Sequence, residues 1–182
     1  MTTTVERIKV WDGFVRVFHW TVVSCVLANL FLLESGEAPH RWAGYLATGF
    51  VVARLVWGFV GSRYARFADF FPTPRRLAQH WADMKAGRPD THPGHNPLGA
   101  LMMLALMALI LALGVTGYLL GTDAYWGDET MEGIHEALAN TLMGLVGLHV
   151  LAALLMSHLS RVNLIKAMVT GVKERKLAEK QG

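Results

Sequence analysis

Four long runs of apolar residues alternate with polar segments along the 182-residue chain. The runs cover residues 14–33, 42–60, 98–120 and 134–159. Each has the roughly 17–25 residues that an apolar helix needs to cross a bilayer. Lipid offers no partner for backbone N–H and C=O groups, so a helix is the expected form of each run. The pattern predicts an all-α integral membrane four-helix bundle that forms a single domain over residues 1–182.

Charged side chains separate by sign between the segments that join the runs. The N-terminal segment, the middle loop and the tail are basic, with Arg7, Lys9, Arg16, Arg63, Arg66, Arg75, Arg76, Lys85, Arg88, Arg161, Lys166, Lys173, Arg175, Lys176 and Lys180. The other two loops are acidic, with Glu34, Glu37, Asp123, Asp128, Glu129 and Glu132. The positive-inside rule therefore places both termini and the middle loop in the cytoplasm.

The composition excludes several other classes of protein. Hydrophobic residues make up 53% of the chain and charged residues 17%, against about 25% charged in an average globular domain. A disordered chain, an ordinary soluble globule and a nucleic-acid-binding domain are therefore not expected. The net charge of +3 is the sum of the charges on a basic and an acidic membrane face. The single cysteine, Cys25, excludes a disulfide framework, a CxxC metal or redox site and covalent haem attachment. Within its apolar run it should be a small buried hydrophobe.

The middle loop contains one segment with helical periodicity. Residues 75–86 carry Leu77, Trp81 and Met84 among polar neighbours. This spacing predicts a short amphipathic helix at the membrane surface.

Four of the eight histidines lie within or at the ends of the apolar runs, namely His19, His40, His135 and His149. His135 and His149 are separated by fourteen residues, which is about 40° short of four helical turns, so both point to nearly the same helix face. Their Cα atoms should be roughly 21 Å apart along the axis. By depth, His40 matches His135 near the outer surface, and His19 matches His149 in the inner half of the membrane.

Two histidines from facing helices at one depth can supply both axial ligands of a haem b. The two pairs therefore predict two haems stacked across the bilayer, with the four imidazoles as iron ligands. A lone membrane histidine is more often a packing or interfacial residue than a ligand. Four histidines that form two pairs at matching depths are much less expected by chance. A structural zinc site would need four ligands clustered together. The HExxH motif is also missing, because Ala139 stands where its second histidine would be.

The other histidines do not fit this pattern. His158 is about half a turn out of phase with His149, so it should face away from the haems. His80 and His92 lie in the middle loop and are expected in solvent.

Three further polar residues are candidates for contacts near the inner surface. Arg54 lies fourteen residues after His40, and Arg16 lies one turn before His19. Both arginines are cofactor-binding candidates that could pair with haem propionates. The alternative for both is an anchor at the membrane edge. His95 precedes Asn96 and Pro97, which are the expected N-cap and first residue of a helix. A contact with a propionate or a quinone is the alternative for His95.

These residues lie in stretches that resemble the prokaryotic cytochrome b561 family, which is also similar to the b-type cytochrome subunits of nickel-iron hydrogenases and formate dehydrogenases. The stretches are Val10-Trp11-Asp12, Arg16-Val17-Phe18-His19-Trp20, His40-Arg41-Trp42-Ala43-Gly44-Tyr45, Arg54-Leu55-Val56-Trp57-Gly58, Gly94-His95-Asn96-Pro97, Ile134-His135-Glu136-Ala137-Leu138-Ala139, Leu148-His149-Val150, and Asn163-Leu164 to Gly171. The resemblance covers nearly the whole chain, and the histidine positions are its specific part. Many members carry paired histidines after the inner ligand of the fourth run, where this chain has only His158.

The resemblance implies a multi-pass protein of the bacterial inner membrane with two non-covalent haems b. Members pass electrons between a quinone pool and a partner, such as a periplasmic c-type cytochrome or an enzyme subunit, and some oxidise superoxide and pass the electrons to quinone. Catalytic residues are not identified, and whether the chain is itself an oxidoreductase enzyme stays open. From the residues alone, a histidine-lined proton or metal-ion transporter and a non-catalytic membrane anchor are the alternatives.

Overall fold

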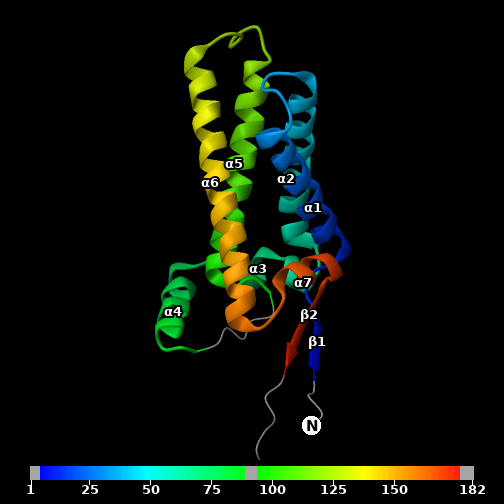
Figure 1. The fold of residues 1–182 in the computed structure, drawn as a ribbon, viewed down its shortest axis with the longest axis vertical. Coiled ribbons are helices and arrows are strands. Elements are labelled where there is room, and N and C mark those ends of the chain that lie inside the picture. The colour runs from blue at the N-terminus through cyan, green and yellow to red at the C-terminus, as the bar shows by residue number, and fades with distance from the viewer. Residues whose placement is uncertain (1–4, 89–93, 177–182) are drawn as a thin grey trace, which may run out of the picture.

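The computed structural model describes residues 5–88 and 94–176, and Figure 1 shows four long helices side by side. They are α1 (Gly13–Phe31), α2 (Ala38–Val60), α5 (Pro97–Leu120) and α6 (Glu129–Ser160). All four are long and apolar enough to cross a membrane. The predicted all-α membrane bundle is therefore confirmed.

All four helices begin before the apolar runs that predicted them, because a helix starts at its cap and not at its first apolar residue. Asp128 caps α6 by accepting a hydrogen bond of 2.8 Å from the backbone N–H of Met131. Asn96 caps α5 in the same way, with Pro97 in its first turn, as expected. The earlier start of α2 places His40, which precedes its apolar run, inside a helix.

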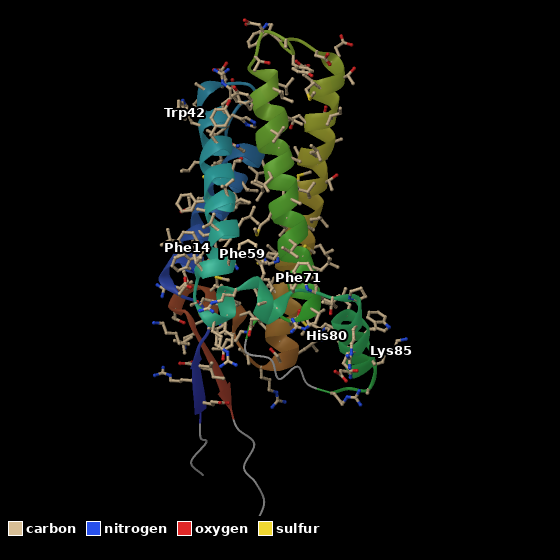
Figure 2. All side chains as sticks on the ribbon, turned by 180° about the vertical axis from the view of Figure 1, so that it is seen from behind. Phe14, Trp42, Phe59, Phe71, His80 and Lys85 are labelled. Atoms are coloured by element: carbon tan, nitrogen blue, oxygen red, sulfur yellow. The ribbon has the colours of Figure 1, made fainter. Side chains whose placement is uncertain are left out.

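The helices pack in the order α1, α2, α5 and α6, each mainly against the next. The main core consists of Phe18, Val22, Cys25 and Val26 from α1, Ala47 and Val51 from α2, Met107 and Ile110 from α5, and Leu142 from α6. The expected burial of the free cysteine is confirmed. Large apolar side chains cover the outside of the bundle, where Trp42 is 72% and Phe59 74% exposed (Figure 2). Such a surface suits lipid rather than water.

Most short elements gather at one end of the bundle, together with both ends of the described chain (Figure 1). The short helices are η1 (Arg63–Ala65), α3 (Phe67–Phe70), α4 (Pro74–Lys85) and α7 (Leu164–Thr170). The predicted amphipathic helix is confirmed as α4, while its place on the membrane surface stays a prediction. The two acidic loops lie at the opposite end, so the molecule has one basic and one acidic end.

The sequence patterns did not predict the two-stranded antiparallel sheet of β1 (Val5–Lys9) and β2 (Val172–Lys176). The backbone N–H groups of Val10 and Trp11 extend this pairing by donating to the carbonyl of Gly171, at 2.8 and 3.1 Å. Gly171 has a φ of +83°, and a Cβ there would lie 2.5 Å from the carbonyl oxygen of Trp11. Only glycine accepts both the dihedral and the close approach. The sheet joins the two ends of the chain.

Candidate functional site

His40 on α2 and His135 on α6 face each other near the acidic end of the bundle, and we call them the outer pair. Their ring centres are 6.4 Å apart and their planes are inclined by 62°. A metal–nitrogen bond to imidazole is about 2.1 Å long. Two such bonds, one to each ring, together with the two distances from ring centre to ring nitrogen, add up to about the observed distance between the ring centres. The outer pair therefore fits a single iron between two imidazoles.

His19 on α1 and His149 on α6 lie towards the other end of the bundle, and we call them the inner pair. They are close enough to interact electrostatically. The Nδ1 atom of His19 is buried and has no hydrogen-bond partner among the described residues, and the same holds for Nδ1 of His40. A buried polar atom left unpaired costs about 1–3 kcal/mol. Rings that are buried without satisfied nitrogens suit a binding site better than a packed core.

The packing of α6 also suits a bulky cofactor. Only 6% of its membrane window is buried, compared with 17% for α1 and α5 and 22% for α2. In the described part of the chain, α6 packs along α5, and its contacts with α1 and α2 are few at most. The histidines of α6 thus face α1 and α2 without close helix–helix packing between them. Within residues 5–88 and 94–176, no three His, Cys, Asp or Glu side chains gather as a metal cage.

Arg54 is a buried cation on α2 that is close enough to His95 and Asp12 to interact with them electrostatically. It is 1% exposed, and its Nη2 donates to the carbonyl of Ala65 at 3.0 Å. Its Nη1 is buried and has no partner among the described residues, and its guanidinium lies 5.6 Å from the ring centre of Phe67. The carboxylate of Asp12 is a nearby anion, and the open Nη1 could take a hydrogen-bond acceptor such as a haem carboxylate.

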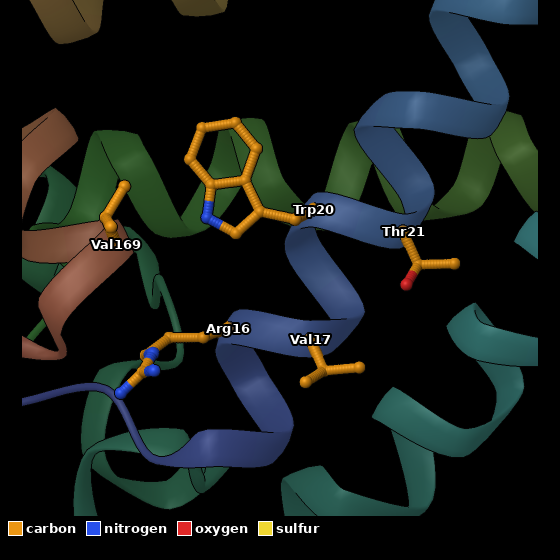
Figure 3. A pocket seen from close by; sticks show the side chains of 5 residues that line it. All are labelled: Arg16, Val17, Trp20, Thr21 and Val169. Atoms are coloured by element: carbon orange, nitrogen blue, oxygen red, sulfur yellow. The ribbon is translucent and has the colours of Figure 1, made fainter.

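Arg16 is placed differently, at the edge of the bundle. Its Nη1 donates to the carbonyl of Thr170 at 3.2 Å, which satisfies a free carbonyl in the last turn of α7. Figure 3 shows Arg16 and Trp20 reaching towards Val169 across a hollow of about 330 Å³ between α1 and α7. The contact with α7 favours a structural role for Arg16 over a cofactor contact, although its Nε is also buried without a partner.

His95 lies in the loop before α5, packed between two aromatic rings. Its ring centre is 4.6 Å from that of Trp11 and 5.2 Å from that of Phe70. Burial lowers the pKa of His95 well below its usual range, and the nearby positive charges of Lys173 and Arg54 lower it further. His95 is therefore a neutral neighbour of the inner pair. Its position beside the N-cap Asn96 was visible in the sequence, but its proximity to the inner pair was not.

The expectation that His80 lies in solvent was wrong. His80 is 8% exposed, and α4, the helix that carries it, packs against α5. Its Nε2 atom has no hydrogen-bond partner among the described residues. His158 is exposed on α6, in agreement with its predicted phase, and His92 lies outside the described residues.

Two residues near the site were not singled out from the sequence. Thr116 on α5 makes a 2.7 Å hydrogen bond with Nδ1 of His135. Asp12 accepts hydrogen bonds from Trp57 and Ser62 at the inner end of α1. A threonine in the most apolar span and an acid directly before a membrane helix were the only available signals.

Comparison with known proteins decides the class of molecule. The family described as prokaryotic cytochrome b561 matches residues 10–171. The chain belongs to this family. As a cytochrome b561 protein it is a multi-pass protein of the bacterial inner membrane, a b-type cytochrome that takes haem b and transfers electrons. The paired imidazoles and the uncovered face of α6 agree with that cofactor.

The cytochrome b561 chain is also similar to curated proteins of other bacteria. It is 26% identical to the probable Ni/Fe-hydrogenase 1 B-type cytochrome subunit of Escherichia coli (strain K12), over 93% of this chain and 92% of the relative. It is 24% identical to the probable Ni/Fe-hydrogenase B-type cytochrome subunit of Rhizobium leguminosarum bv. viciae, over 91% and 88%. The corresponding protein of Azotobacter vinelandii is 26% identical over 90% and 87%. No solved structure matches the chain significantly.

Proposed function

We propose that this chain holds two haems b within one domain of residues 1–182 and carries electrons across the inner membrane. The outer pair, His40 and His135, would hold one haem, and the inner pair, His19 and His149, the other. The observation that carries the proposal is the placement of His135 and His149 on one face of α6, each with a histidine partner from another helix at its own depth.

A haem b supplies one-electron redox chemistry, and filling both axial positions with imidazole favours electron transfer over binding of a substrate to the iron. The chain's own residues orient the rings and exclude water. The open Nη1 of Arg54 would neutralise a propionate of the inner haem. Arg16 is the weaker candidate for the same role, because its guanidinium already contacts Thr170.

We further propose that both termini and the middle loop are cytoplasmic, which makes the outer pair periplasmic. The support is the concentration of Lys and Arg at the end that carries the termini and of Asp and Glu at the other end. Electrons moving between the two haems would then cross the membrane potential, at about 2.3 kcal/mol per charge for each 100 mV.

The proposed partners are the quinone pool and a second redox protein. The relatives are named as subunits of Ni/Fe-hydrogenases, which supports an enzyme subunit as the partner, and a periplasmic c-type cytochrome is the alternative. Oxidation of superoxide with transfer of the electrons to quinone is the alternative activity.

Haem counting on the purified protein tests the proposal. A pyridine haemochrome assay should give two haems b per chain, and a redox titration should resolve two potentials. Quinol of the native pool should reduce the protein. A colourless protein would refute haem binding and favour the transporter or the membrane anchor. One haem per chain would mean that one of the two histidine pairs does not bind haem.

A further inference from the structure

The side chain of Thr116 connects α5 to the outer pair. Its Oγ1 lies 2.7 Å from Nδ1 of His135. The same oxygen lies 2.9 Å from the carbonyl oxygen of Ala112, one turn back along α5. The contact with His135 bridges α5 and α6, and the contact with Ala112 lies within α5.

The two contacts together determine which atom donates to which. A threonine hydroxyl has one hydrogen, and a carbonyl oxygen can only accept, so both contacts are hydrogen bonds only when the hydrogen of Thr116 goes to Ala112. The hydroxyl oxygen must then accept from His135, which requires the proton of the neutral ring to be on Nδ1. The lone pair of His135 is left on Nε2, the nitrogen that remains available to a metal.

The helix surface beside this bond is shaped to receive the ring. A Cβ at Gly117 would lie 3.3 Å from Cε1 of His135 and 3.8 Å from its Nδ1. The missing side chain lets the imidazole lie against α5, where Nδ1 reaches the hydroxyl. The partner ring differs, because Nδ1 of His40 is buried without a hydrogen bond among the described residues.

We propose that Thr116 is a positioning residue that holds His135 in the tautomer and orientation required to bind the outer haem iron. The inference rests on the proposed outer haem. A hydrogen bond from the non-ligating nitrogen raises the basicity of a metal-binding histidine, and loss of such a partner typically weakens binding about 10- to 100-fold. A more basic ligand also stabilises the oxidised iron, so Thr116 lowers the reduction potential of the outer haem.

Four variants separate the hydroxyl from the packing around it. Thr116→Val keeps the shape and removes the acceptor, and Thr116→Ser keeps the acceptor. Gly117→Ala keeps the hydroxyl but crowds the ring. Thr141→Val is the matched control, because Thr141 makes the same kind of bond to the carbonyl of Ala137 at 2.8 Å and is exposed on α6.

The measurements are the rate of haem transfer to apomyoglobin, the two reduction potentials and the low-spin electron paramagnetic resonance signals, with His135→Ala identifying the outer haem. Thr116→Val should release the outer haem about 10- to 100-fold faster. Any outer haem that it retains should have a higher potential and shifted resonance. Thr116→Ser and Thr141→Val should match the wild type, Gly117→Ala should fall between, and the inner haem should not change.

Two results would overturn the inference. One is a Thr116→Val protein with wild-type release and wild-type outer potential. The other is a Thr116→Ser protein as impaired as Thr116→Val, which would assign the effect to packing of the methyl group. If Thr116→Val does not accumulate, Thr116→Ala replaces it, since it also removes the hydroxyl and should release the outer haem faster than Thr116→Ser. A wild-type protein without haem would instead refute the proposed function.

Discussion

The carboxylate of Asp12 accepts a hydrogen bond of 3.0 Å from the indole nitrogen of Trp57, which joins the start of α1 to the last turn of α2. The hydroxyl of Ser62 donates to the same oxygen, and the other oxygen caps α1 through the N–H of Val15 at 2.8 Å. Burial by itself would raise the pKa of Asp12. The hydrogen bonds and the charge of Arg54 outweigh it and lower the pKa below its usual value.

Replacing Asp12 should therefore loosen the inner end of the bundle. Asp12→Ala removes the helix cap and leaves Trp57 and Ser62 without an acceptor, and we expect a loss of about 1–3 kcal/mol in the free energy of unfolding. Asp12→Asn keeps a cap and should cost less. Because the folded pKa is lowered, this contribution is complete above about pH 3.8 and is lost as the pH falls through the folded pKa. Thermal unfolding in detergent measures it, and an unchanged midpoint in Asp12→Ala would contradict the prediction.

The histidine pairs predict which variants lose the same haem. His40→Ala and His135→Ala should each lose the outer haem and retain the inner one. His19→Ala and His149→Ala should do the reverse, while His158→Ala and His80→Ala should retain both. Haem counts with redox titrations decide the matter. If His158→Ala removed a haem and His149→Ala did not, the inner pair would be wrong.

Arg54 should influence the inner haem through its charge. Arg54→Gln removes a buried positive charge from the inner end, which disfavours the added electron and should lower the inner reduction potential. Arg54→Lys should lower it less, and Arg16→Gln should have the smaller effect because Arg16 already contacts α7. Redox titration reads the two haems separately. An inner potential that is equal in Arg54→Gln and the wild type would exclude the propionate contact.

The proposed orientation is open to a direct measurement. Reporter fusions after Lys85 and at the C-terminus should be cytoplasmic, and fusions near Glu37 and Asp128 should be periplasmic. The physical basis is the excess of Lys and Arg on three separate segments that lie at one end of the bundle. A periplasmic C-terminus would exchange the inner and outer haems.

The acidic end of the molecule predicts how the protein meets a basic partner, such as a small periplasmic c-type cytochrome. Complementary charge mainly raises the encounter rate, and salt screens it over about 8 Å at physiological strength. Electron transfer to such a partner should slow as salt rises. A variant combining Asp123→Asn, Glu129→Gln and Glu132→Gln should be slower at low salt and less sensitive to added salt, with unchanged haem content. Asp128 is left in place because it caps α6. Stopped-flow rates across a salt series test this, and an unchanged slope would exclude the acidic loops from docking.

Features within a single helix were predictable from the order of residues. Apolar runs of membrane length predicted α1, α2, α5 and α6, since lipid forces the backbone to satisfy its own hydrogen bonds. The shared face of His135 and His149 followed from the fixed rotation and rise of an α-helix. The depth of His40 followed from its place in its own span.

Contacts between segments distant along the chain were decided by packing alone. No local pattern could show that Thr116 reaches His135, that Trp57 donates to Asp12, or that His80 is buried on a helix that packs against α5. The pairing of β1 with β2 was hidden for the same reason, because each strand finds its partner at the opposite end of the chain. Helical periodicity relates a residue to its neighbours within a few turns. Relations between helices depend on how whole side-chain surfaces fit together, which becomes determined only when the bundle assembles.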